Sequence, residues 1–226
     1  MQPLLSWYDA GHRDLPWRSE PAPYRVWVSE IMLQQTRVEA VRGYFSRWMN
    51  ALPDIPALAA ADEAVYTKLW EGLGYYSRVR NLHRAAVLLC EEYGGELPAD
   101  YDRLLALPGV GEYTAGAVAS IAFGLPVPAV DGNVLRVAAR LDNDFTPITD
   151  AKFKNQTRER FAALMPSDRS GDLNQSLMEL GATVCLPNGA PKCEVCPLFD
   201  QCLAGKHQTW TEYPFKKSAK PRRIED

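Results

Sequence analysis

The stretch Leu107-Pro-Gly-Val-Gly-Glu-Tyr-Thr-Ala-Gly-Ala-Val118 places a four-residue turn between two predicted helices. Gly109 and Gly111 can adopt the positive φ that such a tight turn needs. The amides that open the second helix have no partner within it and lie at the positive end of its dipole. We therefore predict a helical hairpin that can bind a phosphate, although this stretch alone fits an αα-hairpin without a ligand equally well.

Helical periodicity of apolar residues continues along the whole chain, and no segment shows a convincing strand alternation. The pattern predicts an all-α protein. The expected helices are Leu4 to Ala10, Tyr24 to Thr36, Val38 to Asn50, Asp62 to Glu71, Arg78 to Tyr93, Tyr101 to Leu107, Tyr113 to Phe123, Asn133 to Leu141, Ala151 to Met165 and Asp172 to Val184.

The charge balance limits the kind of nucleic-acid contact that is possible. The net charge is -3, which argues against a protein that coats nucleic acid generally. Any DNA contact is expected to be local, through backbone amides and a few placed cations. The tail is basic, with Lys216, Lys217, Lys220, Arg222 and Arg223, and is expected to be a solvated linker. No apolar run is long enough for a membrane span and no basic leader precedes the chain, so we expect a cytoplasmic protein.

Two carboxylates stand out for catalysis. Glu30 is spaced three or four residues from apolar neighbours of its predicted helix. Such a carboxyl is poorly solvated, which favours the protonated form that a general acid needs, although position alone fits a surface Glu more often. Asp131 comes directly before a predicted helix in Asp-Gly-Asn, where an N-cap is the usual role and the helix start favours the ionised form.

Both carboxylates lie in motifs that resemble one enzyme family. The run Ser29-Glu-Ile-Met-Leu-Gln-Gln-Thr36 closely resembles a signature of the MutY-type adenine DNA glycosylases, which belong to the helix-hairpin-helix or endonuclease III superfamily. Val-Asp-Gly-Asn-Val, around Asp131, resembles the pattern that carries the catalytic Asp of that superfamily. The resemblance implies that Glu30 is the acid that protonates departing adenine, that Asp131 stabilises or traps the oxocarbenium-like sugar, and that Asn133 supports it.

Tyr113 distinguishes between subclasses. In the related endonuclease III enzymes the hairpin continues with a Lys whose amine forms a Schiff base with the sugar. Here the corresponding residue is Tyr113, in Glu-Tyr-Thr. The resemblance therefore implies a monofunctional glycosylase that uses water and leaves the strand intact.

The resemblance also implies DNA contacts and a base pocket. An enzyme that flips a base must fill the gap left in the duplex. Tyr75, in Gly-Leu-Gly-Tyr-Tyr, matches an intercalating tyrosine, whereas spacing alone favours a core aromatic. The remaining expected DNA-contact residues are Leu33, Gln35, Pro108, Gly109, Val110 and Gly111, and those expected at the adenine pocket are Arg13, Leu15, Trp17 and Arg18. A Trp17 packed between the two lobes is an equally good expectation.

Four cysteines are spaced as Cys185-x7-Cys193-x2-Cys196-x5-Cys202. Such clustering favours a metal or iron–sulfur site over disulfides, and the spacing alone fits zinc and [4Fe–4S] about equally. The family pattern binds [4Fe–4S] and has six residues in the first gap. We therefore expect a [4Fe–4S] cluster with one residue inserted in that gap.

The resemblance extends over nearly the whole chain and implies two helical lobes with the active site in the cleft between them. Residues 21–126 would form a six-helix barrel with the helix-hairpin-helix, residues 1–20 and 127–213 an iron–sulfur cluster domain, and residues 214–226 the tail. The implied function is release of adenine mispaired with 8-oxoguanine or guanine in double-stranded DNA, by a monomer that acts at the nucleoid. Family members usually continue into a domain that recognises 8-oxoguanine, so we expect a weaker preference for 8-oxoguanine over guanine.

Two alternatives stay open. A thymine or uracil mismatch glycosylase of the same superfamily can also carry Tyr at the Lys position, although the Gln-Gln that follows Glu30 by four residues and the loop at Trp17 and Arg18 favour adenine. A non-catalytic DNA-binding or cluster-sensing module could keep the hairpin. The presence of both Glu30 and Asp131 argues against that module.

Overall fold

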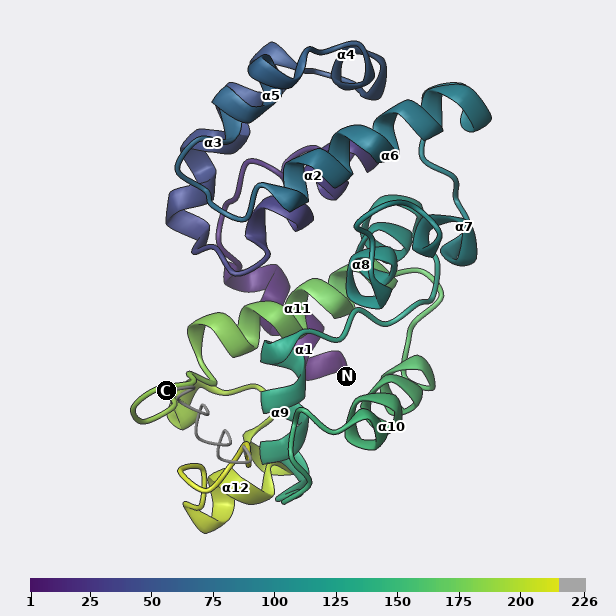
Figure 1. The fold of residues 1–226 in the computed structure, drawn as a ribbon. Coiled ribbons are helices and arrows are strands. Elements are labelled where there is room, and N and C mark those ends of the chain that lie inside the picture. Colours follow the sequence, from purple (N-terminus) through teal and green to yellow (C-terminus); the bar gives the residue numbers. More distant parts are fainter. Residues whose placement is uncertain (216–226) are drawn as a thin grey trace, which may run out of the picture. The chain divides into compact units, whose positions relative to one another are not determined.

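The computed structural model describes residues 1–215, and the basic residues from Lys216 onward lie outside this range. Within it every regular element is helical and no residue lies in a strand, which confirms the all-α prediction (Figure 1). The helices are α1 (Gln2–Gly11), α2 (Pro23–Leu33), α3 (Val38–Ala51), α4 (Ile55–Ala59), α5 (Glu63–Trp70), α6 (Ser77–Tyr93), α7 (Tyr101–Leu105), α8 (Glu112–Phe123), α9 (Gly132–Asp142), α10 (Ala151–Ala162), α11 (Ser170–Thr183) and α12 (Leu203–His207), with 3₁₀ turns η1 (Cys193–Val195) and η2 (Phe199–Gln201).

Local chemistry explains where the observed elements differ from the expected ones. Helix α2 ends at Leu33 rather than Thr36 because Gln35 takes a left-handed φ of 57°. Helices α4 and α12 were not predicted, since five residues are too few to show a period. The N-cap of α4 was visible in the sequence as Asp54, whose carboxylate accepts the Ala57 amide at 2.8 Å.

Contacts group the chain into two compact units. The larger unit comprises residues 13–129 and 165–174, and the smaller comprises residues 1–12, 130–164 and 175–215. The grouping places residues 13–20 in the larger unit, whereas the resemblance places them in the cluster domain. The domain boundaries implied by the resemblance stay a prediction.

Helix α2 is central to the larger unit and packs against α3, α6 and α8, while α4 packs on α6 and α7 on α8. The core of this unit is aromatic as well as aliphatic. Trp48 and Trp70 are fully buried and meet edge to face with their ring centroids 5.6 Å apart. Burial on nearly every face of α2 explains its weak amphipathicity and holds Glu30 within a rigid element.

Asn174, in α11, holds the segment that leads toward Asp131. Its side chain is 1% exposed, donates to the Val127 carbonyl at 2.8 Å and accepts the Ala129 amide at 2.9 Å. It also donates to the Ser120 hydroxyl of α8 at 2.7 Å. These bonds satisfy a stretch that has no regular structure of its own.

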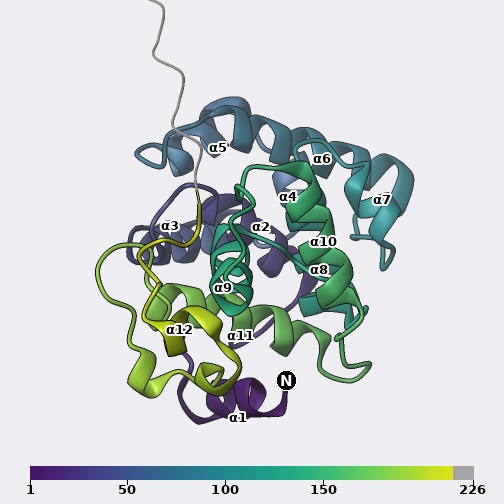
Figure 2. The ribbon, with the colours of Figure 1, turned by 90° about the horizontal axis from the view of Figure 1, so that it is seen from below.

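In the smaller unit α9 packs against α10 and α12 (Figure 2). Helix α9 is strongly amphipathic and carries two buried arginines, Arg136 and Arg140, among its apolar residues. No helix within residues 1–215 has the length and apolarity needed to cross a bilayer.

Candidate active site and cysteine cluster

Glu30 lies near the end of α2 and is only 6% exposed to solvent. The phenol of Tyr113 donates a hydrogen bond to Glu30 Oε2 at 2.6 Å. Tyr113 is the second residue of α8, directly after the hairpin turn, so the hairpin and the packing of α2 on α8 place its ring beside Glu30. The sequence analysis counted Tyr113 among the expected catalytic residues, because it replaces the Lys of the endonuclease III enzymes, but it did not predict this hydrogen bond.

Asp131 is the N-cap of α9, as its position in the sequence predicted. Its Oδ1 accepts the Val134 amide at 2.8 Å, and its Oδ2 accepts the Asn133 side-chain amide at 2.7 Å. These bonds favour the carboxylate, in the direction expected from a helix start. Burial outweighs them and raises the pKa of Asp131 above its ordinary value.

Arg136 fixes the amide that supports Asp131. Its Nη2 donates to Asn133 Oδ1 at 2.9 Å and to the Gly181 carbonyl at 2.7 Å, and its Nε donates to the Cys185 carbonyl at 2.9 Å. Asn133 is thereby oriented with its NH₂ group toward Asp131. The cysteine loop and the carboxylate are joined by a continuous hydrogen-bonded path through one guanidinium.

The hairpin is the turn Pro108 to Gly111, between α7 and α8. Gly109 takes the expected positive φ, 77°, and a Cβ there would lie 2.7 Å from Cβ of Asn81. Gly111 does not: it is the N-cap of α8, with an extended φ of -100°. The expectation for Gly111 was wrong because an N-cap residue adopts β geometry rather than left-handed geometry.

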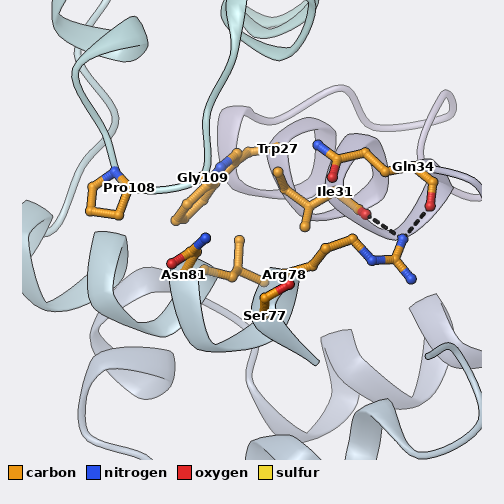
Figure 3. A pocket seen from close by; sticks show the side chains of 9 residues that line it. Trp27, Ile31, Gln34, Ser77, Arg78, Asn81, Pro108 and Gly109 are labelled. Carbon is orange, nitrogen blue, oxygen red and sulfur yellow. Dashed lines mark hydrogen bonds between the residues drawn. The ribbon is translucent and has the colours of Figure 1, made fainter. Parts of the chain in front are cut away.

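Helix α8 begins at Gly111 without a side-chain cap. Val110, predicted as a DNA contact, has its side chain buried in the core, and its amide donates to the Leu107 carbonyl at 3.1 Å. Its role in DNA contact stays a prediction. Pro108 and Gly109 border a cavity that α2 and α6 also line (Figure 3).

The predicted inserting residues lie in two segments near α2 and α6. Tyr75 is 63% exposed and has a left-handed φ of 48°. Gln35 is exposed, and Leu33, the last residue of α2, is half-buried. Their role in DNA stays a prediction. Arg78, which the sequence analysis did not single out, hydrogen-bonds to both segments.

The loop Arg13 to Arg18 packs onto the larger unit. Leu15 and Trp17 belong to its core, and Trp17 meets Phe45 edge to face at 5.4 Å between centroids. Arg18 donates to the carbonyl of Arg13 at 3.1 Å, so its guanidinium holds the loop together. Trp17 is therefore buried in the core of the larger unit, and its expected place between the lobes stays a prediction. A role of this loop in a base pocket stays a prediction.

All four clustered cysteines line one cavity, together with Arg140 and Trp210. None of them forms a disulfide. The Val184 carbonyl accepts the Lys192 amide at 3.0 Å and closes the seven-residue gap, within which Gly189 takes a φ of 75°. Arg140 donates to Cys185 Sγ at 3.3 Å, and Cys202 Sγ accepts the Gly205 amide at 3.3 Å.

The donor set of this cavity suits a cationic group. Burial and the neighbouring sulfurs raise the pKa of Cys193 and Cys202, and burial raises that of Cys196 to about 11. A bound cation reverses that effect, because thiolates are its ligands. Within residues 1–215, no three His, Cys, Asp or Glu side chains are arranged to hold one metal ion as they stand. The four sulfurs surround a shared cavity.

Sequence signals for the buried arginines were weak. Arg136 and Arg140 are four residues apart in an otherwise apolar run, a spacing that places both on one helix face. Their place on one face of an amphipathic helix was the signal that could have identified them. Arg78 follows the Tyr-Tyr turn, and no such pattern in the sequence identified it.

Comparison with known proteins gives one consistent family. Residues 28–163 match the profile described as HhH-GPD superfamily base excision DNA repair protein. The adenine DNA glycosylase of Mus musculus is 47% identical over 89% of this chain, and that of Mycolicibacterium smegmatis is 41% identical over 98%. This chain spans 41% of the mouse protein and 73% of the mycobacterial one, and less than two thirds of several other such relatives.

Solved structures agree on the fold. A thermostable thymine-DNA glycosylase superposes with a TM-score of 0.81 at 27% identity, covering 91% of this chain and 94% of that one. A trapped endonuclease III–DNA covalent intermediate superposes with a TM-score of 0.76 at 25% identity, covering 92% of this chain and 94% of that one.

Proposed function

Because the chain belongs to the HhH-GPD superfamily of base excision DNA repair proteins, and within it to the adenine DNA glycosylases, we propose that it removes adenine mispaired with 8-oxoguanine or guanine in double-stranded DNA. The observation that carries this proposal is the buried Glu30 held by Tyr113 at 2.6 Å. A buried carboxyl is the kind of group that the proposed acid role needs, and position 113 carries a phenol rather than an amine.

The proposed reaction divides the work between two carboxyl groups. Glu30 donates a proton to adenine as the bond between its nitrogen and C1′ of the sugar breaks. Asp131, as a carboxylate, stabilises the oxocarbenium-like sugar or adds to it. Water then adds to C1′ and loses a proton, which leaves free adenine and an abasic site in an uncut strand. The two hydrogen bonds that Asp131 accepts favour the charge this step needs.

The cysteine cavity is proposed to hold a [4Fe–4S] cluster through Cys185, Cys193, Cys196 and Cys202. The iron–sulfur core, when bound, would supply positive charge to the four thiolates and would cross-link the segments that carry them. Arg140 places its guanidinium beside Cys185, and the Gly205 amide points at Cys202. Both are the kind of donor that stabilises cluster sulfur.

DNA binding is proposed for the hairpin amides and for the two segments near Leu33 and Tyr75. The hairpin offers an uncapped helix start to a phosphate. Tyr75 is an exposed aromatic that can fill the gap left by a flipped adenine. An overall net charge of -3 agrees with local contacts of this kind.

The test compares matched duplexes that carry A opposite 8-oxoguanine, A opposite G, T opposite G or U opposite G, with the released base identified by mass spectrometry. We expect adenine from the first two duplexes and no thymine or uracil from the others. Release of thymine or uracil without adenine would replace the proposal with the mismatch glycosylase. No base from any duplex, with DNA binding intact, would point to the binding module.

A further inference from the structure

Two residues with side chains adopt left-handed backbone geometry at positions that are not helix C-caps. Gln35 has a φ of 57° and Tyr75 a φ of 48°, whereas the comparable Asn143 and Gln208 are ordinary C-caps of α9 and α12. A left-handed residue with a Cβ is unfavourable by about 1–2 kcal/mol. Such geometry persists only where the surrounding structure holds it, and it clusters at functional sites.

One guanidinium contacts both of these segments. Arg78 Nη1 donates to the carbonyls of Ile31, at 3.1 Å, and Gln34 (Figure 3). It also donates to the carbonyl of Met32 at 3.1 Å. Its Nη2 donates to the carbonyls of Leu73 at 2.9 Å and Gly74 at 3.2 Å. The carbonyls at the end of α2 and those of the turn before Tyr75 therefore share one donor group.

Aromatic rings complete the surroundings of this guanidinium. Its central carbon lies 5.3 Å from the ring centroid of the buried Trp70 and 5.5 Å from that of the exposed Tyr75. Trp70 itself donates to the Gly74 carbonyl at 3.0 Å. Arg78 thus connects a rigid core aromatic to the exposed one, and a planar fork with five donors is needed for so many simultaneous contacts.

Arg78 also borders the cavity that reaches the hairpin. Gln34, Arg78 and Gly109 line it together, each from a different segment (Figure 3). The hairpin therefore lines the same cavity as the side chain that contacts the other two segments assigned to DNA contact.

We propose that Arg78 is a positioning residue that holds the end of α2 and the turn 72–75 as one unit, so that Gln35 and Tyr75 enter the duplex together. The inference rests on the proposed function for its DNA role, whereas the coupling of the two segments is a property of the free protein. Arg78 does not act on the reacting atoms. It sets the geometry of the residues that keep the flipped adenine's gap open.

The coupling is tested in the free protein with Arg78→Lys, which keeps the positive charge but not the planar fork. We expect hydrogen exchange of backbone amides to speed up about tenfold in both 33–36 and 72–76, because hydrogen bonds from a charged donor are lost in both. The matched control is Arg80→Lys, two residues on, where an exposed ion pair with Glu63 at 3.0 Å should make no difference. Faster exchange in only one segment, in neither, or throughout the protein would overturn the coupling.

The DNA role is tested with 2-aminopurine placed next to the target adenine, whose fluorescence rises when its neighbour unstacks. We expect Arg78→Lys to reduce this rise and to slow adenine release by about 10- to 100-fold, as misplacement of positioning groups does. Tyr75→Ala combined with Arg78→Lys should lose less than the product of the two single losses, because part of the effect of Arg78 acts through Tyr75. Fully additive losses would show that Arg78 acts independently of Tyr75, and a Lys variant that behaves like the parent protein would show that charge rather than positioning matters. Either result would overturn the proposal.

The failure of the two proposals can be told apart. If the parent protein neither unstacks nor releases adenine, the proposed function fails and the DNA role of Arg78 fails with it. The coupling of segments 33–36 and 72–76 in the free protein would still be decided by the hydrogen exchange of their backbone amides. If the parent protein is active and Arg78→Lys is equally active, the positioning role is wrong and the proposed function remains.

Discussion

Replacing Gly109 with serine should destabilise the larger unit by several kilocalories per mole. A φ of 77° costs a residue with a Cβ about 1–2 kcal/mol. The added Cβ would also lie 2.7 Å from Cβ of Asn81 on α6, which is far inside contact distance. Overpacking of this kind costs about 1–3 kcal/mol, so the free energy of unfolding should fall by about 2–5 kcal/mol in total.

Gly111→Ser is the matched control, with the same side chain two residues away. Gly111 is extended, and no atom lies within 4 Å of a Cβ built there. Serine is a favoured N-cap, so stability should be unchanged or rise by a few tenths of a kcal/mol. Its hydroxyl would, however, accept an α8 amide that we assign to a DNA phosphate. We therefore expect DNA affinity to fall by about fivefold while stability does not.

Urea unfolding followed by tryptophan fluorescence measures both changes, because Trp27, Trp48 and Trp70 are buried in the larger unit. The midpoint should drop for Gly109→Ser with an unchanged slope, and should not drop for Gly111→Ser. Equal destabilisation of the two variants, or a change below about 0.5 kcal/mol for Gly109→Ser, would refute this account of the hairpin.

Three further predictions concern the site. Tyr113→Phe should slow single-turnover adenine release by about tenfold with DNA affinity unchanged, since it removes only the hydrogen bond to Glu30; an unchanged rate would contradict that role. Because the pKa of Asp131 is raised in the folded state, its contribution to stability is complete below pH 3.8 and is lost as the pH rises through the folded-state pKa. Urea unfolding across pH should therefore show the parent protein losing stability relative to Asp131→Asn as the pH increases. A difference in stability that stays constant with pH would contradict this account. Arg140→Met should weaken cluster retention about 10-fold or more, seen as less iron and acid-labile sulfide per protein after purification, because the donor to Cys185 is lost; full iron content would count against it.

Features set by neighbouring residues were predictable from the sequence. The hairpin turn, the Asp131 cap and most helix bounds follow from glycine, proline and N-cap chemistry within a few residues. The helix end expected at Thr36 was wrong for a long-range reason as well as a local one. Arg78, more than forty positions later, satisfies carbonyls at the end of α2 that would otherwise favour another helical turn.

Contacts between distant residues were not predictable in the same way. Tyr113 is 83 positions from Glu30, and Arg136 is 49 positions from Cys185. Neither pairing leaves a periodic trace in the chain, because a single side chain carries it. Resemblance to a family identified the residue types of the site, whereas the structure identified which side chains hold them.

The most direct test of the central claim is single-turnover treatment of a duplex with adenine opposite 8-oxoguanine, each sample split with and without alkali. The parent protein should give strand breaks only after alkali, and Glu30→Gln and Asp131→Asn should give none. Breaks without alkali would contradict the assignment of a monofunctional glycosylase. Undiminished breaks in the Glu30→Gln sample would contradict the assignment of Glu30 as the acid.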